Sequence, residues 1–176
     1  MVKLHDLVFE PYLSEEEINS AINKIAEKLN ADYENDRPVF LSVLNGSFMF
    51  SSEIMKKYNG ECDIQFVKLG SYEGTESSGD VRTLIGLTKS LSGKKVVILE
   101  DIVDTGGTLK KLDEILIEKN VAEYKVATLF HKPSIYREKF KLDYIGIEIP
   151  NEFIVGYGLD YDGLGRNLTS VYKRKS

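Results

Sequence analysis

The fold is decided by one stretch in the middle of the chain, Val96-Val97-Ile98-Leu99-Glu100-Asp101-Ile102-Val103-Asp104-Thr105-Gly106-Gly107-Thr108. Its first four residues are apolar without interruption, which is typical of a strand buried on both faces of a parallel sheet. Acidic residues come next, then a loop of small residues, and then an amphipathic run that predicts a helix over 105–119. This order predicts an α/β fold with an open, mainly parallel twisted sheet and helices on both faces.

Each part of this stretch has a chemical use. The two glycines, Gly106 and Gly107, allow positive φ and let the backbone approach a ligand closely. The amides that open the following helix favour an anion such as phosphate, and the hydroxyls of Thr105 and Thr108 add neutral donors. Carboxylates beside this loop would repel a bare phosphate ester, so they suit sugar hydroxyls, Mg²⁺ or a proton. These carboxylates are Glu100, Asp101 and Asp104.

An ordinary turn with a helix cap is the simpler interpretation of Asp104-Thr105-Gly106-Gly107. These four residues alone do not separate a turn from a binding loop. A turn does not need an acidic pair on the strand before it, however, so the longer pattern favours a site for a phosphorylated sugar.

The composition is that of one soluble globular domain over residues 1–176. Apolar residues make up 42% and charged residues 29% of the chain, which is ordinary for that class. The net charge of −5 argues against a nucleic-acid-binding surface, and no segment is long and apolar enough for a membrane span. Cys62 is the only cysteine, so an internal disulfide is excluded. Because the N-terminus lacks the apolar core of a signal peptide, the expected location is the cytosol.

A second strand–loop–helix unit precedes the first. Val39–Leu44 is predicted as a buried strand, Asn45-Gly46-Ser47 as its loop, and a helix follows from Phe48. The Ser14–Glu17 capping box predicts a packing helix. Further strands are predicted at 62–69, 82–87, 125–130 and 144–149. Because ligands bind at the carboxyl ends of parallel strands, both loops are expected at one edge of the sheet, although residues 45–47 alone read better as an ordinary turn.

Two segments resemble a known family. The stretch 96–108 closely resembles the phosphoribosyl-diphosphate (PRPP) binding motif of the type I phosphoribosyltransferases. The segment Phe153-Ile154-Val155-Gly156-Tyr157-Gly158-Leu159-Asp160-Tyr161 is similar to the Phe-Val-Val-Gly-Tyr-Xaa-Leu-Asp-Tyr segment of the hypoxanthine-guanine branch. The resemblance implies the type I phosphoribosyltransferase fold, with a small hood formed by the N-terminal and C-terminal segments.

The same resemblance implies a purine salvage enzyme. It would transfer the 5-phosphoribosyl group from PRPP to N9 of hypoxanthine, and of guanine, giving IMP or GMP and pyrophosphate. The sequence leaves open the preference between these bases and the tolerance of xanthine.

Roles for the residues of the PRPP motif follow from the resemblance. The 5′-phosphate would be held by Thr105, Gly106, Gly107 and Thr108. The ribose hydroxyls would be received by Glu100 and Asp101, and the Mg²⁺ cofactor would be placed by Glu100, Asp101 and Asp160. Asp104 would exchange a proton with N7 of the purine. Some relatives have a basic or polar side chain at the position of Gly107, where only a backbone contact is expected here.

Pyrophosphate would be bound by Leu44, Asn45, Gly46 and Arg166. A non-proline cis peptide is common in the family at this first loop. Asn45 stands where a basic residue is common, so backbone contacts are expected there in place of a direct charge contact. Ser71-Tyr72 fits the start of a family loop that closes over the reaction centre and excludes water.

The purine base would be recognised by three residues. Lys132 would donate a hydrogen bond to the exocyclic oxygen, and because an ammonium group has donors and no acceptor, it selects a 6-oxo over a 6-amino group. Phe153 would stack on the ring, and the backbone of Ile154 would read its edge. His131 is interpreted as a structural residue.

A non-catalytic regulator on the same fold, binding nucleotide and RNA, is the alternative. It would keep the phosphate loop, but it is expected to have a basic face, which the acidic composition does not favour. The expected partners are therefore PRPP and a 6-oxopurine base, with no nucleic acid and no membrane. Family resemblance also implies a homodimer or a homotetramer.

Overall fold

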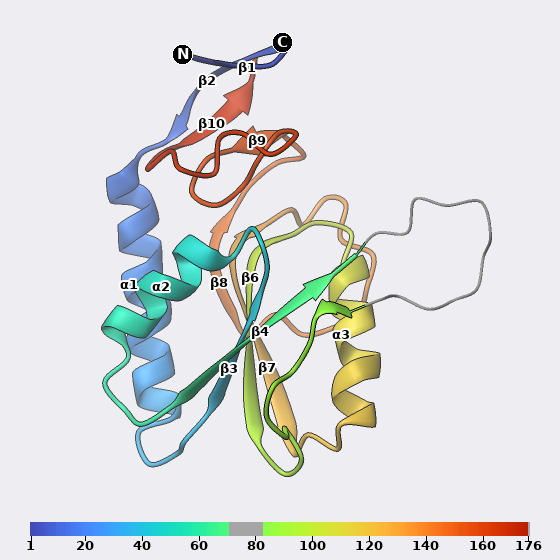
Figure 1. The fold of residues 1–176 in the computed structure, drawn as a ribbon. Coiled ribbons are helices and arrows are strands. Elements are labelled where there is room, and N and C mark those ends of the chain that lie inside the picture. The colour runs from blue at the N-terminus through green and yellow to red at the C-terminus, as the bar shows by residue number, and fades with distance from the viewer. Residues whose placement is uncertain (71–82, 176) are drawn as a thin grey trace, which may run out of the picture.

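The apolar stretch that opened the sequence forms β6 (Lys95–Val103), a central strand of a six-stranded sheet. In the computed structural model, which describes residues 1–70 and 83–175, this sheet has the order β5-β4-β3-β6-β7-β8 (Figure 1). The other strands are β3 (Val39–Val43), β4 (Asp63–Leu69), β5 (Thr83–Ile85), β7 (Glu123–His131) and β8 (Tyr144–Glu148). All pairings are parallel except that of β5 with β4, so the predicted mainly parallel sheet is confirmed.

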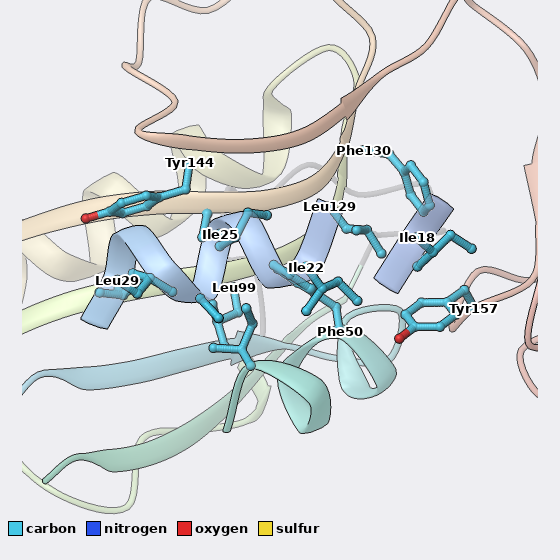
Figure 2. Close-up of a cluster of buried hydrophobic side chains, with 14 of the residues drawn as sticks. Ile18, Ile22, Ile25, Leu29, Phe50, Leu99, Leu129, Phe130, Tyr144 and Tyr157 are labelled. Atoms are coloured by element: carbon cyan, nitrogen blue, oxygen red, sulfur yellow. The ribbon is translucent and has the colours of Figure 1, made fainter. Parts of the chain in front are cut away.

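Helices cover both faces of this sheet. The helices α1 (Glu15–Asp32) and α2 (Phe48–Lys57) lie on one face, and α3 (Gly107–Glu118) lies on the other (Figure 1). A hydrophobic core lies on each face of the sheet. Val97 and Leu99 of β6 pack in the first core, on the side of α1 and α2, and Val96 and Ile98 pack in the second core, on the side of α3. Figure 2 shows the first core, where side chains from α1, α2 and the sheet interlock. Because successive side chains point to opposite faces, the four consecutive apolar residues Val96–Leu99 are all buried.

The capping box predicted at the start of α1 is confirmed. The Glu17 amide donates to Ser14 Oγ at 3.2 Å, and the Ser14 amide donates to Glu17 Oε2 at 2.8 Å. Six apolar positions of α1 fall on one face and are buried, namely Ile18, Ala21, Ile22, Ile25, Ala26 and Leu29. Alignment of these side chains on one helical face attaches α1 to the sheet.

A second, smaller sheet forms the hood. It has the antiparallel order β1-β2-β10-β9 and is built from both ends of the chain (Figure 1). Its strands are β1 (Val2–Leu4), β2 (Leu7–Leu13), β9 (Ile154–Val155) and β10 (Val171–Arg174). Tyr157 and Val171 of the hood belong to the same buried cluster as α1. The hood is therefore packed directly on the core, as the resemblance implied.

Two boundaries differ from the sequence prediction. Helix α3 begins at Gly107, not at residue 105, because Gly106 has a φ of 92° and interrupts helical geometry. The strand predicted at 82–87 is limited to Thr83–Ile85 among the described residues. Within the described part of the chain, no helix combines the length and the apolar character needed to cross a bilayer.

Candidate active site

Three loops and the hood meet at the carboxyl edge of the main sheet. Gly46, after β3, lies so close to Asp101 of β6 that a Cβ at Gly46 would collide with the Asp101 carboxylate. The Lys132 amide, after β7, donates to the Val103 carbonyl at 2.9 Å. On the hood, a Cβ at Gly158 would collide with the Gly46 carbonyl oxygen. Contacts between neighbouring loops thus bring together the residues that the sequence assigned to separate half-sites.

Loop 104–108 leads from β6 into α3. The Asp104 carboxylate accepts hydrogen bonds from the Thr105 amide and, at 3.2 Å, from the Thr105 hydroxyl. The N-cap residue of α3 is Gly106, with no side-chain capping bond, so neither Asp104 nor Thr105 serves as the helix cap. A small hollow lies beside the loop and is lined by Glu100, Ile102, Val103, Asp104, Gly106, Thr108 and Leu109. Amides at a helix start beside a hollow suit an anionic group.

The two glycines of this loop, Gly106 and Gly107, differ in backbone conformation. Gly106 has a positive φ, whereas Gly107 is the first residue of α3 and has no positive φ. A Cβ on Gly107 would meet only Thr105 Oγ1, at 3.9 Å. The expectation of positive φ is therefore wrong for Gly107, since the helix begins there.

Glu100 and Asp101 point away from each other, as successive strand residues do. Glu100 is 5% exposed, and its Oε2 has no hydrogen-bond partner among the described residues. Burial, reinforced by the charges of Asp101 and Asp104, raises the pKa of Glu100 well above its usual value. Burial also raises the pKa of Asp101 to about 6, although backbone hydrogen bonds and Arg166 oppose the shift. A buried and a half-buried carboxyl at one strand end, both with raised pKa values, are characteristic of functional sites.

Asp104 has a different environment from these two carboxyls. It is exposed, and its carboxylate is held by the Thr105 amide at the mouth of the hollow. An exposed carboxylate on an ordered loop is accessible to a ligand and able to accept a proton.

The first loop, after β3, contains a cis peptide bond between Leu44 and Asn45. The Leu44 amide donates to the Val67 carbonyl at 2.8 Å, while Asn45 is exposed. A buried chain of hydroxyls lies below the loop: Ser51 donates to Ser42, Ser42 to Ser47, and Ser47 to the Val43 carbonyl, at 2.6–2.8 Å. Because Ser47 Oγ donates backward to Val43, it does not cap α2. These bonds fix the backbone groups of the loop.

Asp160 and Arg166 form an ion pair on the hood, with 2.8 Å between Arg166 Nη2 and Asp160 Oδ1. Arg166 Nη1 donates to the Gly158 carbonyl at 2.8 Å, and the Gly163 amide donates to Asp160 Oδ2 at 2.7 Å. Both charged side chains are about one-quarter exposed. The guanidinium is therefore held in one orientation on the Asp101 side of β6, where its charge acts on that carboxyl.

Lys132 and Phe153 are placed from opposite sides of this edge. Lys132 is 9% exposed, and its ammonium has no hydrogen bond or ion pair within residues 1–70 and 83–175. Phe153 is 42% exposed. Its ring centroid lies 5.9 Å from that of Phe9 and 5.7 Å from that of Tyr161. Ile154 follows as the first residue of β9 and is buried. A mostly buried lysine side chain and an exposed, braced aromatic ring suit a flat ligand with an oxygen acceptor.

The carboxylates of this site fit a magnesium ion that takes only part of its ligands from the protein. Within the described parts of the chain, no three His, Cys, Asp or Glu side chains form a group that could hold a metal. Glu100, Asp101 and Asp160 are therefore not a preformed cage. Mg²⁺ commonly takes one or two carboxylates and completes its shell with water and substrate oxygens. The unpartnered Glu100 Oε2 and the Asp101 carboxylate are suited to that mode.

The sequence analysis also named Ser71 and Tyr72, which lie outside the described residues. It gave no role to the segment after Lys132, yet Tyr136 and Glu138 of this segment lie against Gly106. No local signal in the sequence reveals this contact, since it joins two loops about 30 residues apart.

Comparisons with known proteins agree with this geometry. A family described as "Phosphoribosyl transferase domain" matches residues 10–162. A hypoxanthine-guanine phosphoribosyltransferase of Staphylococcus aureus (strain Mu50) is 39% identical over 169 residues, covering 96% of this chain and 94% of that protein. A protein of the same name from Streptococcus pyogenes serotype M3 is 42% identical over 159 residues, covering 90% and 88%.

Solved structures give the same result. A crystal structure of a hypoxanthine phosphoribosyltransferase from S. aureus superposes with a TM-score of 0.88 at 38% identity, covering 97% of this chain and 92% of that one. A hypoxanthine-guanine phosphoribosyltransferase from Bacillus anthracis superposes with a TM-score of 0.87 at 31% identity, covering 96% and 99%.

Gly46 and Gly107 provide a matched pair of substitutions. Gly46→Ala should lower the free energy of unfolding by about 1–3 kcal/mol, because the new Cβ meets the Asp101 carboxylate. Gly107→Ala should change it by less than about 0.5 kcal/mol, because its Cβ has open space. Urea denaturation measures both values. Equal effects of the two substitutions would contradict the close contact at Gly46.

Asp101→Asn should raise the free energy of unfolding of the ligand-free protein at neutral pH by about 1–3 kcal/mol. The native-state pKa of about 6 lies above the ordinary value of 3.8, so the native state binds more protons and wild-type stability falls as pH rises through this window. The gain should vanish below about pH 4, where the carboxyl is protonated in both states. Urea denaturation across this range tests it, with the exposed Asp104→Asn as the control, and a gain independent of pH would refute the assignment.

Proposed function

The chain belongs to the phosphoribosyltransferase family, and from that premise we propose that it transfers the 5-phosphoribosyl group of PRPP to N9 of hypoxanthine, and of guanine. The products are IMP or GMP and pyrophosphate. One observation carries the proposal: the Lys132 amide donates to the Val103 carbonyl, so the mostly buried Lys132 side chain starts directly beside loop 104–108. The base and the 5′-phosphate of one nucleotide can then bind at these two neighbouring sites.

Loop 104–108 holds the 5′-phosphate through the backbone amides of residues 105–108 and the hydroxyls of Thr105 and Thr108. The hollow beside the loop and the start of α3 support this role. Glu100 and Asp101 receive the ribose hydroxyls; a hydroxyl donor would satisfy Glu100 Oε2, which is buried without a partner among the described residues. The ribose thus lies over the end of β6.

Pyrophosphate binds between the first loop and the hood. The backbone of Leu44, Asn45 and Gly46 provides contacts there, and the planar guanidinium of Arg166 provides charge and a fork of donors. Glu100, Asp101 and Asp160 are the residues that would hold Mg²⁺ together with substrate oxygens and water, and the ion would supply positive charge to the diphosphate. To bind the diphosphate, Arg166 must share its guanidinium donors between the diphosphate and Asp160, with which it is paired in this structure.

The purine lies between Lys132 and the hood. Lys132 donates to the 6-oxo oxygen, Phe153 stacks on the ring, and the backbone of Ile154 contacts its edge. The exposure of the Phe153 ring, braced by Phe9 and Tyr161, supports the stacking role.

In the reaction, the bond from C1′ to the pyrophosphate oxygen breaks and the bond from N9 to C1′ forms. Positive charge builds on the ribose ring, and negative charge develops on pyrophosphate beside Arg166. The base must lose one proton overall, and the Asp104 carboxylate accepts it at N7. The exposure of the Asp104 side chain supports this assignment.

The proposal covers residues 1–176 as one domain, supported by the buried cluster shared between hood and sheet. It includes a cytosolic location and a homodimer or homotetramer, for which the exposed Phe48 and Phe66 offer apolar surface. Size-exclusion chromatography with light scattering measures the oligomer. The alternative, a nucleotide- and RNA-binding regulator, is not favoured, since the curated relatives reported above are named as enzymes.

Incubation with PRPP, Mg²⁺ and each base tests the function. IMP and GMP should form and AMP should not, because an ammonium donor cannot pair with a 6-amino group. Lys132→Ala should reduce the preference for hypoxanthine over adenine at least about tenfold, while Lys24→Ala on exposed α1 surface should not. Absence of nucleotide formation, with RNA binding present, would favour the regulator instead.

Asp104→Asn should lower kcat by about 10²-fold or more while sparing the KM for PRPP, because the amide cannot accept the proton. Steady-state kinetics with PRPP varied at saturating hypoxanthine measures both constants. An unchanged kcat would remove Asp104 from the reaction.

A further inference from the structure

The segment from Lys132 to Phe140, between β7 and β8, is bonded to both half-sites. The Lys132 carbonyl accepts hydrogen bonds from the Ile135 and Tyr136 amides, each at 3.2 Å, which close a tight turn after Lys132. The next amide, of Arg137, donates to the Thr105 carbonyl at 3.3 Å. This segment therefore runs from the base-binding lysine to loop 104–108 within a few residues.

The Tyr136 side chain occupies the junction between these two parts. A Cβ added to Gly106 would lie 2.8 Å from Tyr136 Cε2 and 2.7 Å from Glu138 Cγ, so the Tyr136 ring and the aliphatic part of Glu138 together cover this face of Gly106. The ring also contacts His131 edge-on, with 5.3 Å between centroids, and its hydroxyl donates to the Phe140 carbonyl at 2.9 Å. One side chain is thus in contact with loop 104–108, the end of β7 and the following segment.

Few interactions within loop 104–108 stabilise its conformation. Gly106 is in the left-handed region, no side chain caps α3, and Asp104, Thr105 and Gly107 are exposed. A glycine backbone without external support samples many conformations. The Tyr136 ring and the Arg137 amide supply support from outside the loop, on the face away from solvent.

We infer that Tyr136 is a positioning residue, which holds loop 104–108 against the Lys132 turn and so sets the separation between the phosphate and base sites. This inference rests on the proposed function. Tyr136 is not a catalytic residue, because its ring is occupied by Gly106 and His131 and its hydroxyl by Phe140. Its effect is on the fraction of molecules whose loop is ready to bind.

Three variants test the inference. Tyr136→Ala removes the ring, Tyr136→Leu keeps apolar volume without a flat face, and Tyr136→Phe keeps the ring without the hydroxyl. Tyr124→Ala is the matched control: Tyr124 is a partly buried tyrosine of the same core, at the start of β7, with its hydroxyl bonded to Asp113 at 2.6 Å. Within the described part of the chain, no hydrogen bond joins the Tyr124 side chain to residues 104–108.

Tyr136→Ala and Tyr136→Leu should raise the KM for PRPP about tenfold, with a smaller fall in kcat, because the competent loop state becomes a minor population. Affinity for IMP, measured by calorimetry, should fall by a similar factor. Tyr136→Phe should restore both values to within about twofold of wild type. Tyr124→Ala should lower the melting temperature comparably while leaving KM and IMP affinity unchanged.

The results separate the inference from the function on which it rests. If wild type forms nucleotide but Tyr136→Leu keeps wild-type KM and IMP affinity, the positioning role is refuted and the function stands. Equal rises in KM for Tyr124→Ala and Tyr136→Leu also refute it, since the effect would then follow general destabilisation. If wild type forms no nucleotide, the proposed function itself fails. Should Tyr136→Ala not fold, the Leu and Phe variants decide.

Discussion

The constraint on which the site depends lies at the end of β6, where the Glu100 carboxyl is buried and the next carboxyl, of Asp101, is half-buried. Glu100 and Asp101 follow four apolar residues that are fully enclosed by helices, so the acids enter a region where charge is poorly solvated. Their raised pKa values show the cost. A ligand with hydroxyls and a divalent cation would offset it, which explains how a fold can keep such an arrangement.

The alternation of a β-strand divides the site into two sides. Glu100 lies by the hollow beside α3, whereas Asp101 lies by Gly46, Arg166 and Asp160. PRPP has a phosphate at one end and a diphosphate at the other, with the ribose between them. Because neighbouring side chains of one strand point to opposite faces, one pair of acids can meet the sugar from both directions.

The hood is made from both ends of the chain and packs on the same core as α1. That packing brings the Gly158 backbone against Gly46 and holds Arg166 through Asp160 and the Gly158 carbonyl. Small residues at both positions are required for the contact, since a Cβ at either would collide with its neighbour. The region proposed for pyrophosphate is thus shaped by close backbone approach, in a protein whose first loop, residues 44–47, carries no basic side chain.

Local sequence patterns were sufficient to predict much of the fold of this protein. The apolar run of β6, the Ser14–Glu17 capping box and the strand–loop–helix units predicted the parallel sheet, and two motif-like segments indicated the family. Contacts between distant segments were decided only by the tertiary structure: Gly46 against Asp101, Tyr136 over Gly106, and the start of α3 at Gly107. The physical reason is that periodicity, capping and turn propensity depend on neighbours along the chain, whereas burial, pKa and steric fit depend on segments that meet only after folding.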